Sequence, residues 1–189
     1  MAENKRGRNW TMVIYPESAP EDWRSILDDL HVSWIESPLH DKDVNADGEK
    51  KKAHWHILII FEGNKSYKQV KEIADDLNAP IPQRVESARG MVRYMIHLDN
   101  PEKYQYSQDE IVGHGGADVN HYFEMTVTNR LSVLKDIVQY IHEHHVTNFM
   151  DLLMYALQNS DEWFTVIADK NTLVVNKAID AEWHYDRKK

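Results

Sequence analysis

The chain has 189 residues, of which 42 % are hydrophobic and 28 % charged, the balance of a soluble globular protein. It contains no cysteine, which excludes disulfides, thiolate metal sites and a cysteine nucleophile, so any metal ion must be held by histidines and carboxylates. The net charge of −9 argues against a non-specific nucleic-acid binder, although basic residues cluster locally. No apolar run reaches the roughly 18–20 residues of a membrane span. The N-terminus has no secretory pattern, so we expect a cytoplasmic protein that does not contact a membrane.

Strand and helix patterns alternate in the first part of the chain. Apolar runs bounded by turn residues predict strands, and apolar residues at helical spacing predict helices. The predicted strands cover residues 9–16, 32–39, 53–61 and 81–87, and the predicted helices cover residues 18–30, 66–78 and 88–98. The order β-α-β-β-α-β-α favours an α+β fold, an antiparallel central sheet with flanking helices, over a doubly wound parallel sheet.

From about residue 130 the pattern is helical, with three or four short segments. We therefore expect two domains, a mixed domain at 1–125 and a small all-α domain at 126–189. A domain of about 60 residues builds only a limited core. We expect its apolar helix faces to dock onto sister subunits, which predicts a homo-oligomer.

Two histidines open the strand predicted at 53–61, directly after three lysines. Side chains alternate between the faces of a strand, so His54 and His56 share one face and project side by side. Two imidazoles in this arrangement are suited to grip one metal ion. Read alone, such a pair is more often a set of packed, hydrogen-bonded histidines.

The preceding strand ends in the sequence SPLHDKD at 37–43. A hairpin between the two strands would bring His40 and a carboxylate, Asp41 or Asp43, next to the histidine pair. Three imidazoles and one carboxylate, without sulfur, suit Mn²⁺, Mg²⁺, Zn²⁺ or Fe²⁺. The spacing does not choose between the two aspartates or among these metals.

A tyrosine lies on the helix predicted at 88–98. Tyr94 shares a helix side with His97, and Arg89 and Arg93 lie nearby. Most tyrosines on short helices belong to the core, but tyrosine also serves as a covalent nucleophile. His97, one turn from Tyr94, is a candidate to accept the phenol proton, and the two arginines are candidates to bind phosphates.

The segments SPLHDKD, KKAHWHILI and RYMIHLDNPEKYQY occur in the order and at the spacing of the motifs of the HUH endonucleases. Within that superfamily, residues 8–115 resemble the rolling-circle replication initiators of small plasmids from Gram-positive bacteria. The sequence YPESAPEDW at 15–23 is similar to the first strand and helix of that family. The helical C-terminal part is similar in length and pattern to the oligomerisation domain of streptococcal-type initiators.

The resemblance implies a metal-dependent enzyme that nicks and rejoins single-stranded DNA at a plasmid origin through a 5′-phosphotyrosine intermediate. The implied metal ligands are His40, Asp43, His54 and His56, and the implied ion is Mn²⁺ or Mg²⁺. It is the resemblance that selects Asp43 over Asp41.

The same resemblance assigns the nucleophile to Tyr94, with His97 as the candidate proton relay. Tyr104 and Tyr106 are competitors that follow in a predicted loop and that the family pattern disfavours. A relaxase or a single-strand transposase uses the same motifs and remains an alternative. A non-catalytic, metal-stabilised DNA-binding regulator and a small-molecule oxygenase or hydrolase are alternatives from other classes.

Basic residues beside these motifs are candidates for contacts with the DNA backbone. The candidates are Lys50, Lys51, Lys52, Arg89 and Arg93. The chain has no phosphate-binding loop of the G-x-x-x-x-G-K-[ST] type, so a separate host helicase is expected to unwind the DNA. The family also implies a homo-oligomer such as a hexamer.

Overall fold

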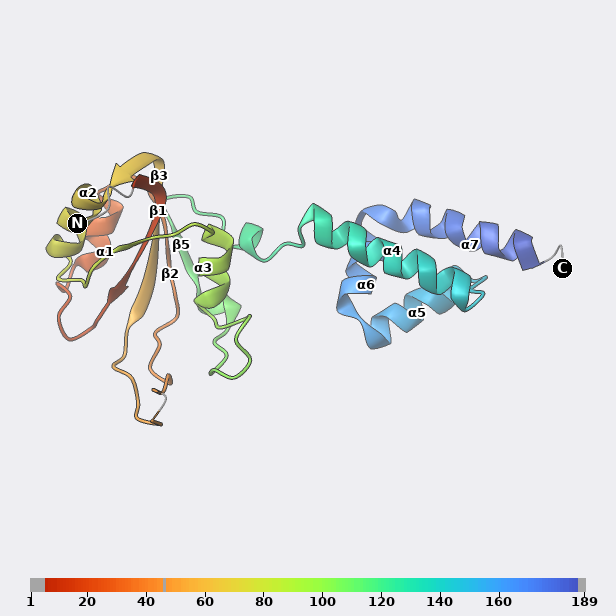
Figure 1. The fold of residues 1–189 in the computed structure, drawn as a ribbon, viewed down its shortest axis with the longest axis horizontal. Coiled ribbons are helices and arrows are strands. Elements are labelled where there is room, and N and C mark those ends of the chain that lie inside the picture. The colour runs from red at the N-terminus through yellow and green to blue at the C-terminus, as the bar shows by residue number, and fades with distance from the viewer. Residues whose placement is uncertain (1–5, 46, 187–189) are drawn as a thin grey trace. The chain divides into compact units, whose positions relative to one another are not determined.

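A five-stranded sheet with the strand order β4-β1-β3-β2-β5 forms the centre of the first part of the chain. The structure, a computed structural model, describes residues 6–45 and 47–186. These divide into two compact units, and the boundary between them in the chain falls between Glu124 and Met125 (Figure 1). All neighbouring strands pair antiparallel. The predicted α+β class, with an antiparallel sheet, flanking helices and a following all-α part, is confirmed.

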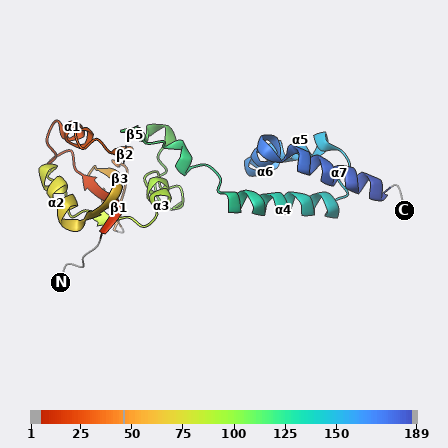
Figure 2. The same ribbon diagram turned by 90° about the horizontal axis from the view of Figure 1, so that it is seen from above.

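The first unit follows the predicted order of elements and adds one short strand at the edge of the sheet. Its strands are β1 (Arg6–Ile14), β2 (Ser33–Glu36), β3 (Trp55–Ser66), β4 (Gln83–Arg84) and β5 (Val112–His114), and its helices are α1 (Trp23–Asp28), α2 (Tyr67–Asp76) and α3 (Ala88–Tyr94). Short 3₁₀ turns cover Gln108–Glu110 and Asn120–Tyr122. Strand β5 was not predicted, because three residues are too few to show a period of two. Helices α1 and α2 cover one face of the sheet and α3 covers the other (Figures 1 and 2).

The central strand β3 separates two hydrophobic cores. Ile57 and Ile59 are fully buried on the face of α1 and α2, whereas Leu58 and Ile60 pack on the face of α3. The predicted alternation along this strand is therefore present. Strand β3 is paired with β1 on one side and β2 on the other, so backbone hydrogen bonds hold both of its edges. His56 continues the series of residues that faces α3.

Helix α3 is shorter than the sequence pattern predicts. It begins after Ser87, whose hydroxyl accepts a hydrogen bond from the N–H of Gly90, and it ends at Tyr94. The chain then leaves the helix through His97, which adopts a left-handed backbone conformation with φ 57°. The N–H of Leu98 donates to the carbonyl of Arg93, closing the helix end. This turn carries the His97 side chain inward, where a continuing helix would have pointed it elsewhere.

The second unit is a bundle of four helices. They are α4 (Val127–Glu143), α5 (Phe149–Asn159), α6 (Asp161–Val166) and α7 (Thr172–Asp186), with a π turn at Ile167–Asn171 between the last two. Its core contains Ile137 and Ile141 of α4 and Leu152 and Ala156 of α5, all at most 1 % exposed. Among the described residues, no helix is long and apolar enough to cross a lipid bilayer.

Candidate metal centre and nucleophile

The segments that follow β2 and precede β3 bring two of the predicted histidines together. Beyond the regular strands, His40 and His54 form an isolated antiparallel bridge, in which the His40 N–H donates to the His54 carbonyl at 2.8 Å. The pairing also includes Ser37, whose hydroxyl accepts a hydrogen bond from the His56 N–H at 2.9 Å. Backbone hydrogen bonds therefore fix the positions from which the three histidines project, as the predicted hairpin requires.

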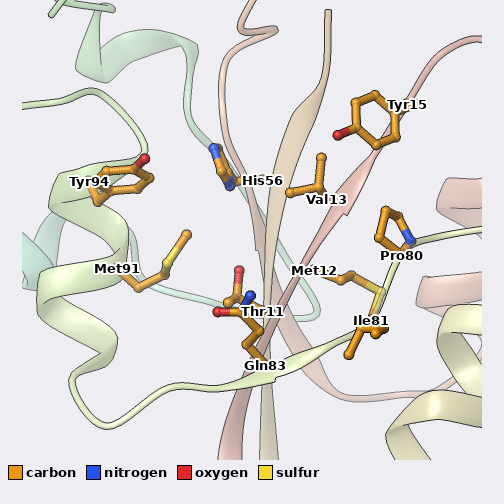
Figure 3. Close-up of a pocket in the computed structure, with 10 residues that line it drawn as sticks. All are labelled: Thr11, Met12, Val13, Tyr15, His56, Pro80, Ile81, Gln83, Met91 and Tyr94. Carbon is orange, nitrogen blue, oxygen red and sulfur yellow. The ribbon is translucent and has the colours of Figure 1, made fainter. Parts of the chain in front are cut away.

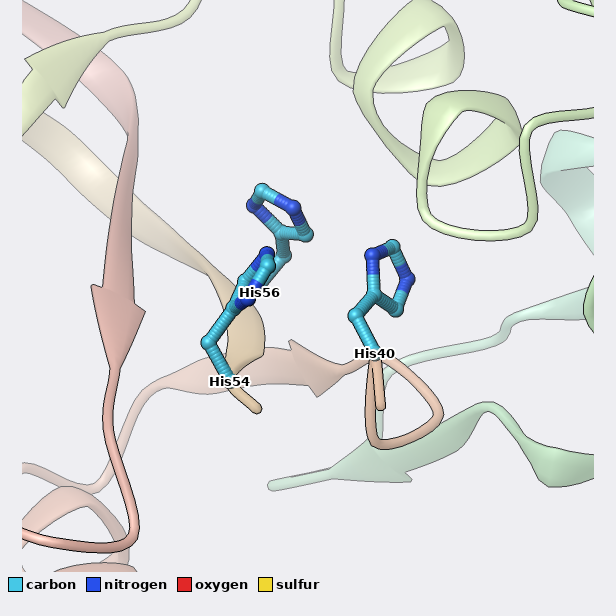
Figure 4. A group of neighbouring side chains, drawn as sticks. All are labelled: His40, His54 and His56. Carbon is cyan, nitrogen blue, oxygen red and sulfur yellow. The ribbon is translucent and has the colours of Figure 1, made fainter. Parts of the chain in front are cut away.

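The three imidazole rings lie next to one another (Figure 4). Their ring centroids lie 5.3 Å apart for His40 and His54, 4.9 Å for His40 and His56, and 5.0 Å for His54 and His56. One ring nitrogen from each can be chosen so that all three lie within 4.8 Å of one another. This spread suits a single bound cation.

Backbone carbonyls orient two of these rings. The Nε2 of His40 lies 2.8 Å from the Met95 carbonyl, and the Nδ1 of His54 lies 2.7 Å from the Lys52 carbonyl. A carbonyl only accepts, so these nitrogens carry the hydrogens and leave a lone pair on the opposite nitrogen of each ring. Histidine ligands of metals are commonly held in this way by a partner on the far nitrogen.

Burial favours the neutral form, which a metal requires, in two of these histidines. It lowers the pKa of His56 to about 3 and also lowers the pKa of His40. The Nδ1 of His40 is buried and has no hydrogen-bond partner in the described part of the chain. It lies 3.4 Å from Oδ2 of Asp43. A lone pair facing a carboxylate is unfavourable in a buried site, and a cation between the two atoms removes the conflict, so these residues fit a divalent metal.

Of the two candidate aspartates, Asp43 lies in the site, whereas Asp41 is exposed. The Oδ1 of Asp43 accepts a hydrogen bond from the hydroxyl of Tyr106 at 3.1 Å. The Tyr106 ring stacks on His40 with a centroid distance of 4.3 Å and an interplanar angle of 5°. Burial raises the pKa of Tyr106, so its hydroxyl stays protonated and can donate to the carboxylate.

The structure places His97 beside Asp43. His97 is fully buried, and its Nδ1 lies 2.8 Å from the Tyr104 carbonyl. Its Nε2 lies 3.8 Å from Oδ2 of Asp43 and has no hydrogen-bond partner among the described residues. His40, Asp43 and His97 form a second group whose ligand atoms lie within 4.8 Å of one another. Toward Tyr94, His97 makes an edge contact between rings, with centroids 5.4 Å apart.

Tyr94 lies at the C-terminal end of α3 and faces the histidines. Its ring meets the His56 ring edge-on, with centroids 5.5 Å apart. Both side chains line a cavity of about 380 Å³ that extends across β1 to Gln83 of β4 (Figure 3). The Tyr94 hydroxyl accepts a hydrogen bond from Nζ of Lys103 at 3.3 Å. The phenol and the His56 ring therefore share one open groove.

The two competing tyrosines lie in different surroundings. The Tyr104 side chain is 45 % exposed, and its hydroxyl accepts from Nζ of Lys42 at 2.8 Å. The Tyr106 side chain is buried, and its hydroxyl is bound to Asp43. Neither residue lines the cavity that Tyr94 shares with His56.

The predicted lysines lie beside the metal centre, whereas the predicted arginines have partners within the protein. Lys50, Lys51 and Lys52 line a shallow pocket together with His54. Arg93 of α3 makes two hydrogen bonds to Asp99, at 2.8 and 2.5 Å.

Arg89 donates to the carbonyl of Glu124. Lys52 also pairs with Glu17 at 3.0 Å, an exposed contact of little energetic weight. DNA phosphates would compete easily with this pair, and less easily with the two-pronged contact of Arg93 to Asp99.

Two site residues were not assigned to these roles from the sequence. Lys103 contacts the Tyr94 hydroxyl, and Tyr106 supports Asp43 and His40. Both follow Pro101 in an irregular segment without periodicity, so no pattern indicates where their side chains point. The available signal was the Asn-Pro turn, which folds this segment back toward α3.

The fold and the site are consistent with the HUH superfamily: an antiparallel sheet presents a histidine pair at its centre, opposite a tyrosine on a helix. Comparison with protein families agrees. Residues 2–120 match the family described as "Plasmid replication protein, origin binding domain", and residues 127–184 match "Replication protein RepB, C-terminal". The chain belongs to this family of plasmid replication proteins.

Individual relatives match along nearly the whole chain. A "Replication protein" of Staphylococcus aureus is 43 % identical over 178 residues, covering 94 % of this chain and 89 % of the relative. A "Replication protein RepB" of Lactiplantibacillus plantarum is 42 % identical over 181 residues, covering 95 % and 82 %. A "Replication protein RepB" of Streptococcus agalactiae is 28 % identical over 187 residues, covering 94 % and 89 %. The chain is thus a replication initiator with plasmid origin DNA as its partner.

Proposed function

We propose that this initiator starts rolling-circle replication by cutting and rejoining one DNA strand at the plasmid origin, with Tyr94 as the nucleophile. The observation that carries the proposal is the shared groove of Tyr94 and His56, which opens beside a buried set of metal-ligating atoms. A metal centre and a phenol on one groove are the two groups that phosphodiester transesterification needs.

The metal ligands in this proposal are His40, Asp43, His54 and His56, and the ion is Mn²⁺ or Mg²⁺. When bound, the ion supplies Lewis-acid stabilisation of charge on the phosphate oxygens. The protein holds the ligands ready, because backbone carbonyls fix the rings of His40 and His54. Little rearrangement is then needed when the ion enters.

The covalent step is an exchange of one phosphodiester for another. The Tyr94 oxygen forms a bond to phosphorus, the bond from phosphorus to the 3′ oxygen breaks, and the 5′ phosphate stays on the tyrosine. The phenol loses its proton and the released 3′ oxygen gains one, leaving a 3′ hydroxyl that can prime synthesis. The phenol proton passes to water, and His97 remains a candidate to take it from there, because its ring lies against the Tyr94 ring but its nitrogens face the Tyr104 carbonyl and Asp43. The phosphotyrosine conserves the bond energy, so rejoining requires no nucleotide cofactor.

We propose that single-stranded DNA follows the groove between α3 and β4, while basic residues contact its backbone. Lys50, Lys51 and Lys52 lie next to His54 and are the strongest candidates for phosphate contacts. Arg89 and Arg93 are candidates that would first have to exchange their protein partners for phosphates. The acidic surplus elsewhere would weaken binding to arbitrary DNA.

The proposed role of the all-α part, predicted at 126–189, is assembly of identical subunits. Leu131 and Val138 of α4 are apolar, yet they are 52 % and 38 % exposed in the single chain. Leu157 of α5 is 53 % exposed. Exposed apolar side chains of this kind support assembly into a homo-oligomer such as a hexamer, in which they would be buried. A separate host helicase would unwind the duplex beyond the nick.

The test is a cleavage assay on a library of supercoiled small plasmids, with Mn²⁺ or with EDTA. After denaturation, the products are examined for protein attached to a 5′ end. We expect nicking with a covalent adduct that needs the metal and is lost in Tyr94→Phe but retained in Tyr104→Phe. Nicking that survives in Tyr94→Phe would contradict the assignment of the nucleophile. Tight binding of Mn²⁺ without nicking of any plasmid would favour a non-catalytic regulator.

A further inference from the structure

We infer that Lys103 is a catalytic residue that stabilises negative charge on the Tyr94 oxygen during both nicking and rejoining. The inference rests on the proposed function of Tyr94 as nucleophile. It deepens that proposal by naming the group that activates the phenol, a role that neither the metal ligands nor the histidine relay supplies.

The geometry places the Lys103 ammonium directly on the phenol. Its Nζ donates to the Tyr94 hydroxyl at 3.3 Å and lies 4.6 Å from the centroid of the same ring. The side chain is half-buried, and within the described residues it pairs with no carboxylate. The ammonium therefore faces the phenol oxygen without a competing carboxylate among the described residues.

A hydrogen-bonded turn holds Lys103 in this position. Its backbone N–H donates to the carbonyl of Asn100 at 3.0 Å. The side-chain amide of Gln105 donates to the carbonyls of both Asn100 and Lys103, at 2.9 and 3.0 Å. These bonds close the segment after α3, so the lysine reaches back over the end of the helix that carries Tyr94. The turn fixes the backbone from which the Lys103 side chain extends to the phenol.

The chemistry explains why an ammonium belongs there. In nicking, the phenol loses its proton to water as the bond from oxygen to phosphorus forms, so negative charge passes through the Tyr94 oxygen. In rejoining, that bond breaks and the charge returns to the same oxygen. A hydrogen bond from an ammonium to an anionic oxygen is stronger than one to a neutral phenol. Lys103 therefore stabilises the transition state more than the resting state, while keeping its own proton.

The chain contains a matched control for this contact. Lys42 donates to the Tyr104 hydroxyl at 2.8 Å and lies 4.6 Å from the centroid of that ring. Replacing Lys42 thus removes the same charge from a tyrosine in the same region, but from one that does not line the groove of His56.

The experiment measures the rate of covalent adduct formation in a single turnover, at saturating single-stranded DNA from a plasmid that the wild type nicks. Lys103→Met should slow adduct formation by about 100-fold, the low end of the effect of removing one stabilising donor. Lys103→Arg should recover most of the rate because it restores the charge. Lys42→Met should stay within about twofold of the wild type.

A chemical rescue separates charge stabilisation from DNA binding. Fluorinated tyrosine placed at position 94 is a more acidic phenol and needs less help to carry negative charge. It should accelerate Lys103→Met more than the wild type. If Lys103→Met forms the adduct as fast as Lys42→Met, the inference is overturned. It is also overturned if Lys103→Met only binds DNA more weakly and fluorinated tyrosine does not restore its rate of adduct formation. If the wild type forms an adduct and Tyr94→Phe does not, either of these outcomes refutes the role of Lys103 and leaves the role of Tyr94 as nucleophile standing. If the wild type forms no adduct at Tyr94, the proposed function and this inference fail together.

Discussion

Tyr106 offers the sharpest test of how the metal centre is held. Its hydroxyl donates to Asp43 at 3.1 Å, and its ring stacks on His40 at 4.3 Å. Tyr106→Phe removes the hydrogen bond and keeps the stacked ring, so the change isolates the orientation of the carboxylate. A distance of 3.1 Å is long for a bond to a charged oxygen, which places the bond at the weak end of its range.

The expected loss follows from that strength. A hydrogen bond to a charged group contributes about 1.5 kcal/mol at the weak end of its range, which corresponds to about tenfold in a binding constant. We therefore expect Tyr106→Phe to weaken Mn²⁺ binding by about tenfold, within the usual effect of a residue that supports a metal ligand. Isothermal titration calorimetry measures this directly, without DNA and without activity.

Tyr122→Phe is the matched control, because Tyr122 is a half-buried tyrosine of the same unit that packs in its core. It should leave Mn²⁺ affinity unchanged. If Tyr106→Phe binds Mn²⁺ as tightly as the Tyr122→Phe control while both remain folded, the carboxylate does not depend on Tyr106 and the reasoning is refuted.

Three further predictions concern stability. Burial lowers the pKa of His56 to about 3, so below pH 6.5 the unfolded metal-free chain binds a proton at this histidine that the folded chain does not bind. The free energy of unfolding is therefore at its full value above the usual pKa of 6.5 and falls as the pH drops toward 3. Lowering the pH from about 7 to about 5 should cost the first unit about 2 kcal/mol in urea unfolding, and an unchanged midpoint would contradict this. Ile59→Ala should destabilise the same unit by about 2–4 kcal/mol, because the side chain is fully buried in the central strand, and a loss below about 1 kcal/mol in denaturant unfolding would argue against that position. Hydrogen bonds from His142 and His145 lower the pKa of Glu182, so the helical unit should lose stability as the pH falls below the usual 4.5. Glu182→Gln should lower its melting temperature and flatten this acid dependence, and identical melting curves for the two proteins across that range would disprove the role.

The parts of the fold that follow from local periodicity could be predicted from the sequence. The alternation along β3 put His54 and His56 on one face, and a hairpin between neighbouring strands placed His40 beside this pair. Both inferences need only the period of two along a strand and antiparallel pairing. The sequence left Asp41 and Asp43 equivalent, because a turn, unlike a strand, has no period that tells which side chain points inward.

The rest of the site depends on where irregular backbone turns. His97 reaches Asp43 because α3 stops at Tyr94 and the chain passes through a left-handed residue, whereas the sequence pattern continues the helix to residue 98. Lys103 reaches Tyr94 through a turn closed by side-chain hydrogen bonds. Such contacts arise from tertiary packing that no local pattern records.

The most direct test of the central claim is to identify the residue that carries the DNA. The covalent adduct formed with Mn²⁺ would be digested with nuclease and trypsin and its peptides analysed by mass spectrometry. The account predicts a nucleotide remnant on Tyr94, absent when EDTA replaces the metal. A remnant on Tyr104 or Tyr106, or strand cleavage that leaves no remnant on any tyrosine, would contradict it.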